Sequence, residues 1–491
     1  MSIVRKLARK KPARPRRQIF IVTAAQNNTD VHKKTWATLK NMVKYYSQYY
    51  PTELKVIRSR YKNPTSQGET NKQKREKEEV WDPQVMPYIL KEKCLLNSRI
   101  MVLNTKVQWA SNNPLQRLDP FTKDKSGIVG HGSRALRSIS VPQHKHPKVM
   151  LTTGACTVNK NYSDTLTGDI GEFNHCLGAV IVEIEGETFY FRELTTDDDG
   201  CIIDLDMEFS PTGWRPAKRA QSLVTGDIHV RWKCDHVIRA TFDAKDSIMK
   251  LVRPHYLALH DVLDFHTRNH HHKEDWLLQY GKHKFGIEDV EKEVNETIRF
   301  INRVTSDECK TLVVSSNHDR AMAKWFTDPQ YDFRKDPVNS KFYARLLVPV
   351  MDGVKKTNGG IKIPDPFILY AKDRVHRNVR FLEQGESFVI GNVEHGFHGD
   401  QGANGARGTT RNLSSIGVKV NKGHSHTAEI VGGCYSAGTS ANKMEYEKGG
   451  PSSHSHAHIL QYANGKRTII FIVNGRYCLP RARPSTWTKA A

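Results

Sequence analysis

The chain has 491 residues, of which 38% are hydrophobic and 26% are charged, and its formal net charge is +23. This length exceeds that of one ordinary domain and predicts two or three domains with packed cores. The mean hydropathy is −0.60, and no uninterrupted apolar run approaches the ~18 residues that a transmembrane helix needs, which argues against a membrane protein. The basic surplus favours a polyanionic partner, of which DNA and RNA are the commonest.

The first 18 residues are basic and lack the apolar stretch of a secretory signal, so we predict a disordered basic arm over residues 1–18. Two interpretations of the arm are open, a solubilising tail and an electrostatic contact with nucleic acid. The eight cysteines include no pair at CxxC spacing, which disfavours a zinc knuckle or a thioredoxin motif. Without a signal peptide, we expect reduced thiols and a cytoplasmic location.

The amino-terminal part alternates strand-like and helix-like segments. We predict strands at 18–26 and 53–61, a helix at 31–50, a long polar loop at 60–82, further strands within 98–108 and 146–158, and a hairpin at 176–194 with its turn near 185–187. This alternation predicts an α/β or α+β domain over residues 19–215. The segment 211–220 has the Pro, Gly and charge content of a connector.

The second part also alternates. We predict a strand at 222–230, helices at 246–263 and 286–304, strands within 310–320, 387–396 and 427–433, and a hairpin at 457–477 with Asn464–Gly465 at its turn. These elements predict a larger α/β domain over residues 216–491.

Five short polar motifs, four of them directly after predicted strands, supply residue types that bind metals. Asp227 and His229 stand two residues apart after SLVT, so they face the same way on extended backbone. Asp261 follows LVRPHYLAL, and one carboxylate can bridge two cations that lie about 3.5–4 Å apart. The other motifs are Asn317–His318–Asp319 after TLVV, Glu394–His395 with His398 after SFVIGNV, and His424–Ser425–His426 before TAEIVGG. Each motif alone fits an ordinary polar side chain, but five in this order indicate a metal centre.

The stretches GDIHV, HDVLD, SNHD, EHG and GHSH together resemble the pattern of the calcineurin-like metallophosphoesterases, namely D-x-H, G-D-x-x-D, G-N-H-[DE], H and G-H-x-H. The resemblance covers residues 222–430 and implies a β-sandwich flanked by helices, in four layers (αββα), within residues 216–491. Two departures stand out, because His260 and Ser316 replace the usual glycines. Both are backbone positions rather than ligands, so we expect the metals to be retained.

The resemblance implies one ion held by Asp227, His229, Asp261 and His426, and a second held by Asp261, Asn317, His395 and His424. We prefer His395 to His398 as a ligand because it ends the apolar strand and precedes a glycine; His398 remains the alternative and a candidate substrate contact. Manganese is the first choice for a site that mixes carboxylate, amide and imidazole ligands, and zinc or iron would also fit.

Beside the ligands, the resemblance implies that His318 stabilises the transition state or protonates the departing oxygen, with Asp319 orienting it. Asp264 is expected to support the site or to begin a helix. A second histidine-rich stretch, His266 and His270–His272, has two open interpretations, a substrate or metal contact and a solvated polar turn.

The superfamily includes phosphatases, nucleotidases, cyclic-nucleotide phosphodiesterases and nucleases. The net charge and the basic arm favour double-stranded DNA, and the Gly-rich segment 399–412 offers Arg407 and Arg411 as phosphate contacts, unless it is an ordinary mobile loop. The whole chain, including FIVTAAQNNT, resembles the early host-DNA-degrading DNases of T5-like bacteriophages and belongs with the nuclease branch. This implies a manganese-dependent DNase acting in the cytoplasm of an infected bacterium, and it allows for a homo-oligomer.

Two other functions compete with the DNase. A phosphomonoesterase acting on nucleotides or phosphoproteins would use the same metals, but the basic surplus argues against it. A non-catalytic DNA-binding protein is disfavoured because no ligand position is missing. In the amino-terminal part, the loops at 129–138 and 151–165 admit phosphate binding, an oligomer contact or no function at all.

Overall fold

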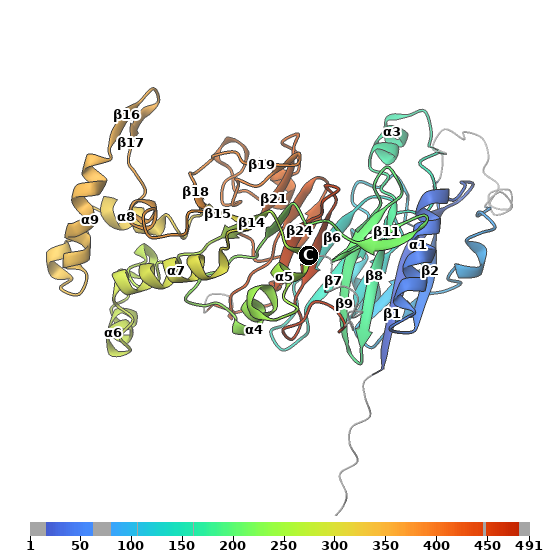
Figure 1. Cartoon of the computed structure of the whole chain (residues 1–491), viewed down its shortest axis with the longest axis horizontal. Coiled ribbons are helices and arrows are strands. Elements are labelled where there is room, and N and C mark those ends of the chain that lie inside the picture. The colour runs from blue at the N-terminus through green and yellow to red at the C-terminus, as the bar shows by residue number, and fades with distance from the viewer. Residues whose placement is uncertain (1–15, 62–79, 106, 161, 445–447, 481–491) are drawn as a thin grey trace, which may run out of the picture.

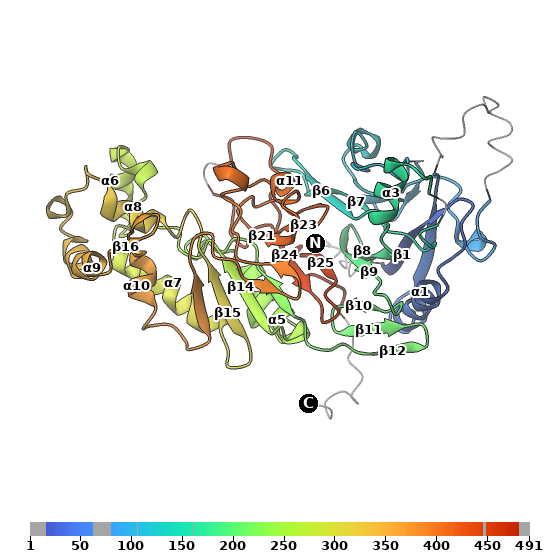
Figure 2. The same cartoon turned by 90° about the horizontal axis from the view of Figure 1, so that it is seen from above.

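The computed structural model describes residues 16–61, 80–105, 107–160, 162–444 and 448–480. The molecule is a mixed α/β protein, elongated along one axis, with the amino-terminal strands at one end, stacked sheets in the middle and a group of helices at the other end (Figures 1 and 2). Of the predicted basic arm, residues 1–15 lie outside the described residues. Arg17 and Gln18 are not part of an arm, since they belong to the first strand.

A six-stranded sheet lies at the centre of the molecule. Its strands, in spatial order, are β18 (Val379–Leu382), β15 (Lys310–Val314), β14 (Tyr256–His260), β13 (Ser222–Val224), β24 (Ala457–Gln461) and β25 (Arg467–Phe471). The first four strands are parallel to one another, and β24 and β25 are antiparallel to their neighbours. In β14, Leu257 and Leu259 enter one core and Ala258 enters the other, so both faces of the sheet are buried.

Helices cover one face of this sheet. They are α4 (Asp235–Ile238), the π-helical turn η3 (Arg239–Asp243), α5 (Ile248–Val252), α7 (Val290–Val304), α8 (Ala321–Thr327), α9 (Ser340–Asp352) and α10 (Pro366–Ala371). Helix α7 begins at the Asp289 cap, whose side chain accepts a hydrogen bond from the Lys292 amide. Its buried residues Val290, Val294 and Ile301 recur at helical spacing and pack into the core beneath the sheet.

A ten-stranded sheet packs against the other face. In spatial order its strands are β19 (Val389–Ile390), β20 (Val393–Glu394), β21 (Lys419–Lys422), β23 (Cys434–Ser436), β22 (Glu429–Val431), β6 (Ala135–Ile139), β7 (Lys148–Thr152), β5 (Ser126–Val129), β4 (Ile100–Leu103) and β3 (Cys94–Leu95). Strands β22 and β6 pair antiparallel, with Ile430 opposite Leu136. The predicted boundary at residue 215 therefore does not divide the sheets, because residues from both sides of it form one sheet and one core.

Two smaller sheets and helix α1 form the amino-terminal end of the molecule (Figures 1 and 2). A four-stranded sheet runs in the order β2 (Thr52–Ser59), β1 (Arg17–Gln26), β8 (Gly178–Glu185) and β9 (Thr188–Thr195), with helix α1 (Lys33–Tyr46) against it. A three-stranded sheet contains β10 (Ile202–Asp204), β11 (Met207–Ser210) and β12 (Gly213–Pro216). The others are α3 (Leu166–Phe173), α6 (Trp276–Lys284), α11 (Thr410–Leu413), the hairpin β16 (Lys355–Thr357) and β17 (Gly360–Lys362), and short 3-10 turns. Among the helices of the described ranges, none has the length and apolar composition needed to span a membrane.

Several predicted elements are confirmed, namely β1, α1, the β8–β9 hairpin, α7 and the β24–β25 hairpin. The helix predicted at 246–263 is wrong. Helix α5 ends where Arg253 adopts a left-handed backbone (φ 44°) before Pro254, and residues 256–260 then form strand β14 between two parallel neighbours. The connector predicted at 211–220 contains β12, and the loop predicted at 60–82 lies mostly outside the described residues.

A fully buried ion cluster stabilises the amino-terminal end. The guanidinium of Arg192 in β9 contacts Glu183 at 2.9 Å and Asp204 at 2.8 Å, and Tyr46 of α1 donates to Asp204. All three charged side chains have no exposed surface. We expect Arg192→Met to lower the free energy of unfolding by about 3–5 kcal/mol, because two buried carboxylates would lose their counter-charge. Urea denaturation measures this loss.

The neighbouring pair Arg215–Glu208 is a matched control, since it joins adjacent strands on the surface and the Arg215 side chain is 68% exposed. We expect Arg215→Met to leave the urea midpoint almost unchanged. Equal midpoints for the two variants would contradict the role assigned to the buried cluster.

Candidate metal centre

The predicted ligands from the first two motifs lie at the carboxyl ends of β13 and β14. Because these strands are parallel and adjacent, their following loops emerge at the same edge of the sheet. The loops run side by side, with the Ile228 amide donating to the His260 carbonyl at 3.0 Å and the His229 amide donating to the Asp261 carbonyl at 2.7 Å. This pairing fixes Asp227 and Asp261 next to each other.

The turn that carries His424 and His426 comes from the ten-stranded sheet, between β21 and β22. Gly423 allows the turn to approach, because a Cβ atom there would lie 2.3 Å from Asp227 Oδ1. Lys422 is buried, and its ammonium group donates to the Gly423 carbonyl at 2.7 Å and to Ser425 Oγ at 3.2 Å. The site therefore joins the edges of two sheets.

Four predicted ligands form one group: Asp227, His229, Asp261 and His426. Each offers one nitrogen or oxygen atom, and these four atoms all lie within 4.8 Å of one another. His426 Nε2 lies 3.3 Å from Asp227 Oδ2, and His229 Nε2 lies 3.7 Å from Asp261 Oδ2. His229 Nε2 and His426 Nε2 are 3.1 Å apart. All four side chains are buried.

A second group shares Asp261 and adds His398 and His424. His398 Nε2 lies 3.2 Å from Asp261 Oδ2. The amide oxygen of Asn317 is 3.2 Å from His424 Nδ1, which brings the third motif to the same place. The two groups meet at Asp261, as expected for a carboxylate shared by two ions.

The structure does not bring His395, the preferred residue of the fourth motif, into this group. Its Nε2 atom lies 2.9 Å from Ser222 Oγ and 3.0 Å from Asn421 Nδ2, and its Nδ1 atom lies 2.9 Å from the Val393 carbonyl. Both ring nitrogens of His395 thus contact polar groups between the two sheets, away from Asp261. The preference for His395 has to be corrected in favour of His398, which stands beyond the following turn and reaches Asp261.

His318 lies beside the first group, but its carboxylate partner is Asp264 rather than the expected Asp319. His318 Nδ1 is 3.2 Å from Asp264 Oδ1, and the same carboxylate lies 3.1 Å from His229 Nδ1 and accepts a hydrogen bond from the Trp232 indole at 3.0 Å. The role predicted for Asp319 is therefore wrong, and Asp264 positions both His318 and His229. The second aspartate of the HDVLD motif, three residues after Asp261, is the sequence feature that pointed to Asp264.

Asp319 instead holds the backbone of the site. Its Oδ1 atom accepts from the Leu263 amide at 2.7 Å, and its own amide donates to Ser316 Oγ at 3.0 Å. Ser316, one of the two departures from the family glycines, thus closes the turn that presents Asn317 and His318. Burial and the charge of Asp261 raise the pKa of Asp319 to about 8.

Four of the candidate ligands have left-handed backbones, with φ of 42° at His229, 45° at Asp261, 73° at His424 and 52° at His426. Side chains other than glycine rarely adopt this conformation, which costs of order 1–3 kcal/mol at each position. Strain of this kind collects at functional sites, where neighbouring structure imposes it.

The buried donor atoms suit divalent cations. Both carboxylate oxygens of Asp227 and Oδ1 of Asp261 are buried without a hydrogen-bond partner among the residues that the structure describes. With Asp264 accepting the proton on His229 Nδ1, the Nε2 lone pair of His229 faces His426 Nε2 and the Asp227 carboxylate, a position that a cation would fill. Carboxylate, imidazole and amide ligands together fit Mn²⁺, Zn²⁺ or Fe²⁺.

The pKa values match this charge distribution. Burial opposes ionisation of Asp227, but the hydrogen bond with His426 and the charges of His398 and His426 together outweigh burial and lower the pKa of Asp227 to about 2. Burial lowers the pKa of His318, while the carboxylates of Asp261 and Asp264 raise it more strongly, to about 9. His318 is thus cationic at neutral pH beside two anionic aspartates.

The predicted substrate contacts from the loop 399–412 are exposed. Arg411 lines a cleft of about 1160 Å³ between the amino-terminal part and β21, β22 and β23, and Arg407 lies on the surface of the loop. Asp400, close to His398, forms an ion pair with Arg320 at 2.5 Å, which ties this loop to the end of β15.

The histidine-rich stretch packs beside the site without joining the ligands. The His266 ring contacts those of Trp232 and His272, with centroids 5.1 and 5.3 Å away, and His270 Nε2 lies 3.1 Å from Lys324 Nζ. In the described part of the chain, these histidines form no group of three that could hold an ion.

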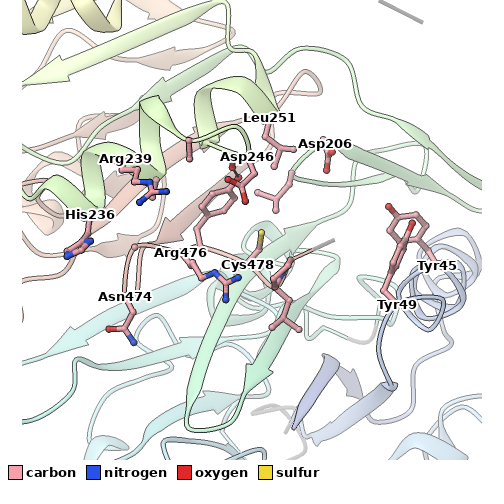
Figure 3. A pocket seen from close by; sticks show the side chains of 17 residues that line it. Tyr45, Tyr49, Asp206, His236, Arg239, Asp246, Leu251, Asn474, Arg476 and Cys478 are labelled. Carbon is pink, nitrogen blue, oxygen red and sulfur yellow. Dashed lines mark hydrogen bonds between the residues drawn. The ribbon is translucent and has the colours of Figure 1, made fainter. Parts of the chain in front are cut away.

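A separate cavity of about 460 Å³ lies between α1, the α4–η3 segment and residues 474–480 (Figure 3). Its lining includes Tyr45, Tyr49, His236, Arg239 and Cys478, and it contains none of the candidate ligands. The candidate metal centre is therefore distinct from this cavity.

Comparison with known proteins gives one relationship that covers most of the chain. No family model matches the sequence, and no solved structure matches it. The chain is 31% identical over 474 residues to Protein A1 of Escherichia phage T5, an alignment that spans 93% of this chain and 82% of that protein. The chain therefore belongs to the family of Protein A1 of Escherichia phage T5.

Proposed function

We propose that the chain is a metal-dependent DNase of the metallophosphoesterase class, which hydrolyses phosphodiester bonds of double-stranded DNA. The observation that carries the proposal is the pair of ligand groups that share Asp261, all buried except the half-buried His424, with the cationic His318 beside them. A sandwich of two sheets with helices on one outer face supports the same class. Homology to a phage protein supports a role in infection, which we place in the host cytoplasm.

In this proposal, Asp227, His229 and His426 would hold one divalent ion, Asn317, His398 and His424 would hold the other, and Asp261 would serve both. When bound, the ions supply Lewis-acid activation of water and of the phosphoryl group. His318 donates a hydrogen bond to the phosphoryl oxygens or a proton to the departing oxygen. Asp264 keeps the His318 ring in place and retains it in its cationic form.

The choice of DNA over a phosphomonoester rests on charge. The net charge of +23 and the exposed Arg407 and Arg411 favour an extended polyanion over a small substrate. Binding should therefore weaken steeply as the salt concentration rises, since each neutralised phosphate releases counterions.

Incubation of the purified chain with supercoiled and linear duplex DNA tests the function. We expect degradation with Mn²⁺, arrest when a chelator is added and recovery when Mn²⁺ is restored. Nucleoside monophosphates and a phosphopeptide serve as competing substrates. Rapid hydrolysis of these with intact DNA would instead favour the phosphomonoesterase, and salt-sensitive DNA binding without any hydrolysis would favour the non-catalytic protein.

A further inference from the structure

His260, the last residue of β14, is fully buried next to the bridging Asp261. A glycine stands at this position in the metallophosphoesterase pattern that the sequence resembles, so the imidazole is a departure from that pattern. The structure makes room for it through Gly423, where a Cβ atom would lie 3.0 Å from both Cβ and Cγ of His260. A buried polar ring at this place needs a partner.

The partner is His398. The two rings stack, with centroids 5.4 Å apart and planes inclined by 30°, and their Nδ1 atoms are 3.2 Å apart. Two ring nitrogens at this distance form a hydrogen bond only if one carries a proton and the other offers a lone pair. Nε2 of His260 has no hydrogen-bond partner within the described ranges, so its one polar contact is to His398.

We propose that His260 is a positioning residue for the second metal ion: it accepts the Nδ1 proton of His398 and thereby turns the Nε2 lone pair of His398 toward Asp261. This inference rests on the proposed metal centre and adds to it a residue that the family pattern lacks. His398 Nε2 already lies 3.2 Å from Asp261 Oδ2. If Nε2 carries the ring proton, it donates to the Asp261 carboxylate; if Nδ1 carries the proton, Nε2 is free to bind the ion.

Two substitutions at His260 separate the hydrogen bond from the packing. His260→Asn keeps an oxygen close to the position of Nδ1, whereas His260→Leu fills a similar volume and cannot accept a proton. His398→Ala marks the complete loss of the ligand. His395→Gln is the matched control, because His395 is also a buried histidine of this region but bonds to Ser222 and Asn421 instead.

Mn²⁺ binding is measured by calorimetry, and Mn²⁺ electron paramagnetic resonance distinguishes a coupled pair of ions from a single ion. We expect wild type and His395→Gln to bind two ions. In His260→Leu, the affinity for one ion should fall about 10–100-fold while that for the other stays unchanged. His260→Asn should recover most of the lost affinity, which a merely space-filling role would not predict.

Two outcomes would overturn the role of His260: affinities of His260→Leu within twofold of wild type, or an equal loss for both ions with no recovery in His260→Asn. If His260→Leu fails to fold, as judged by circular dichroism, comparison of His260→Asn with wild type and His398→Ala still decides the question. Wild type that binds two ions but leaves DNA intact would contradict the DNase alone, and wild type that binds no ion would contradict both proposals.

Discussion

Asp261→Asn is expected to lower the rate of DNA hydrolysis at least about 10³-fold, the equivalent of ~4 kcal/mol in activation free energy. The substitution preserves shape but removes the charge shared by both ligand groups. We therefore expect the affinity for both ions to fall, in contrast to the selective effect predicted for His260. Calorimetric titration with Mn²⁺ and a duplex cleavage assay measure the two effects.

Thermal unfolding in chelator shows whether Asp261→Asn remains folded. Burial opposes ionisation of Asp261, but the charges of His398 and His318 outweigh burial and hold its pKa well below the usual range. Because this carboxylate therefore stabilises the folded state, we expect Asp261→Asn to unfold in one cooperative transition with a lower midpoint than wild type. Asp243→Asn is the control, since Asp243 is exposed at the end of η3 and outside the ligand groups. Asp261→Asn protein that binds two ions with wild-type affinity would contradict the bridging role.

His318→Asn is expected to lower kcat by about 10²–10⁴-fold while leaving both affinities for Mn²⁺ unchanged, since the proposal assigns His318 to the substrate and His318 is absent from both ligand groups at Asp261. Single-turnover cleavage of a short duplex at saturating Mn²⁺ measures the chemical step. A variant with the wild-type rate would remove His318 from the mechanism.

The pH dependence gives a second test of His318. Its pKa of about 9 means that the imidazolium is present at neutral pH and is lost as the pH rises through this value. Because bound cations offset part of the Asp261 charge, we expect the rate of wild type to decline on the alkaline side at or below pH 9. Asp264→Asn removes one of the two carboxylates that raise this pKa, so the decline should move to lower pH. In His318→Asn, the decline should be absent.

The sequence was sufficient to predict the first ligand group. Asp227 and His229 follow strand β13, and Asp261 follows the adjacent parallel strand β14, so sheet topology brings them together, although the left-handed backbone at His229 departs from the extended segment expected. The sequence around His395 and His398 could not show which of the two is the ligand. The choice depends on how β20 pairs with β19 and β21, which turns His395 between the sheets and leaves His398 to approach Asp261.

Two structural features escaped prediction for physical reasons. Strand β21, with the sequence KVNK, has no apolar alternation, because its buried Asn421 and Lys422 form hydrogen bonds. Asn421 accepts from the Arg467 guanidinium, and Lys422 donates to the adjacent Gly423 carbonyl. The pairing of β6 with β22 joins segments far apart in the chain, and no periodicity within either strand reveals its partner.

The pairing of Arg137 in β6 with Glu429 in β22 also sets when the ten-stranded sheet can assemble during synthesis of the chain. Roughly 290 residues separate the two strands, which a ribosome adding about 5–20 residues per second needs some 15–60 s to produce. His398, His424 and His426 lie near the late end of this interval. A nascent chain therefore lacks three of the candidate ligands until these segments emerge, and we expect divalent-ion binding at the candidate metal centre only after residue 426 has left the ribosome.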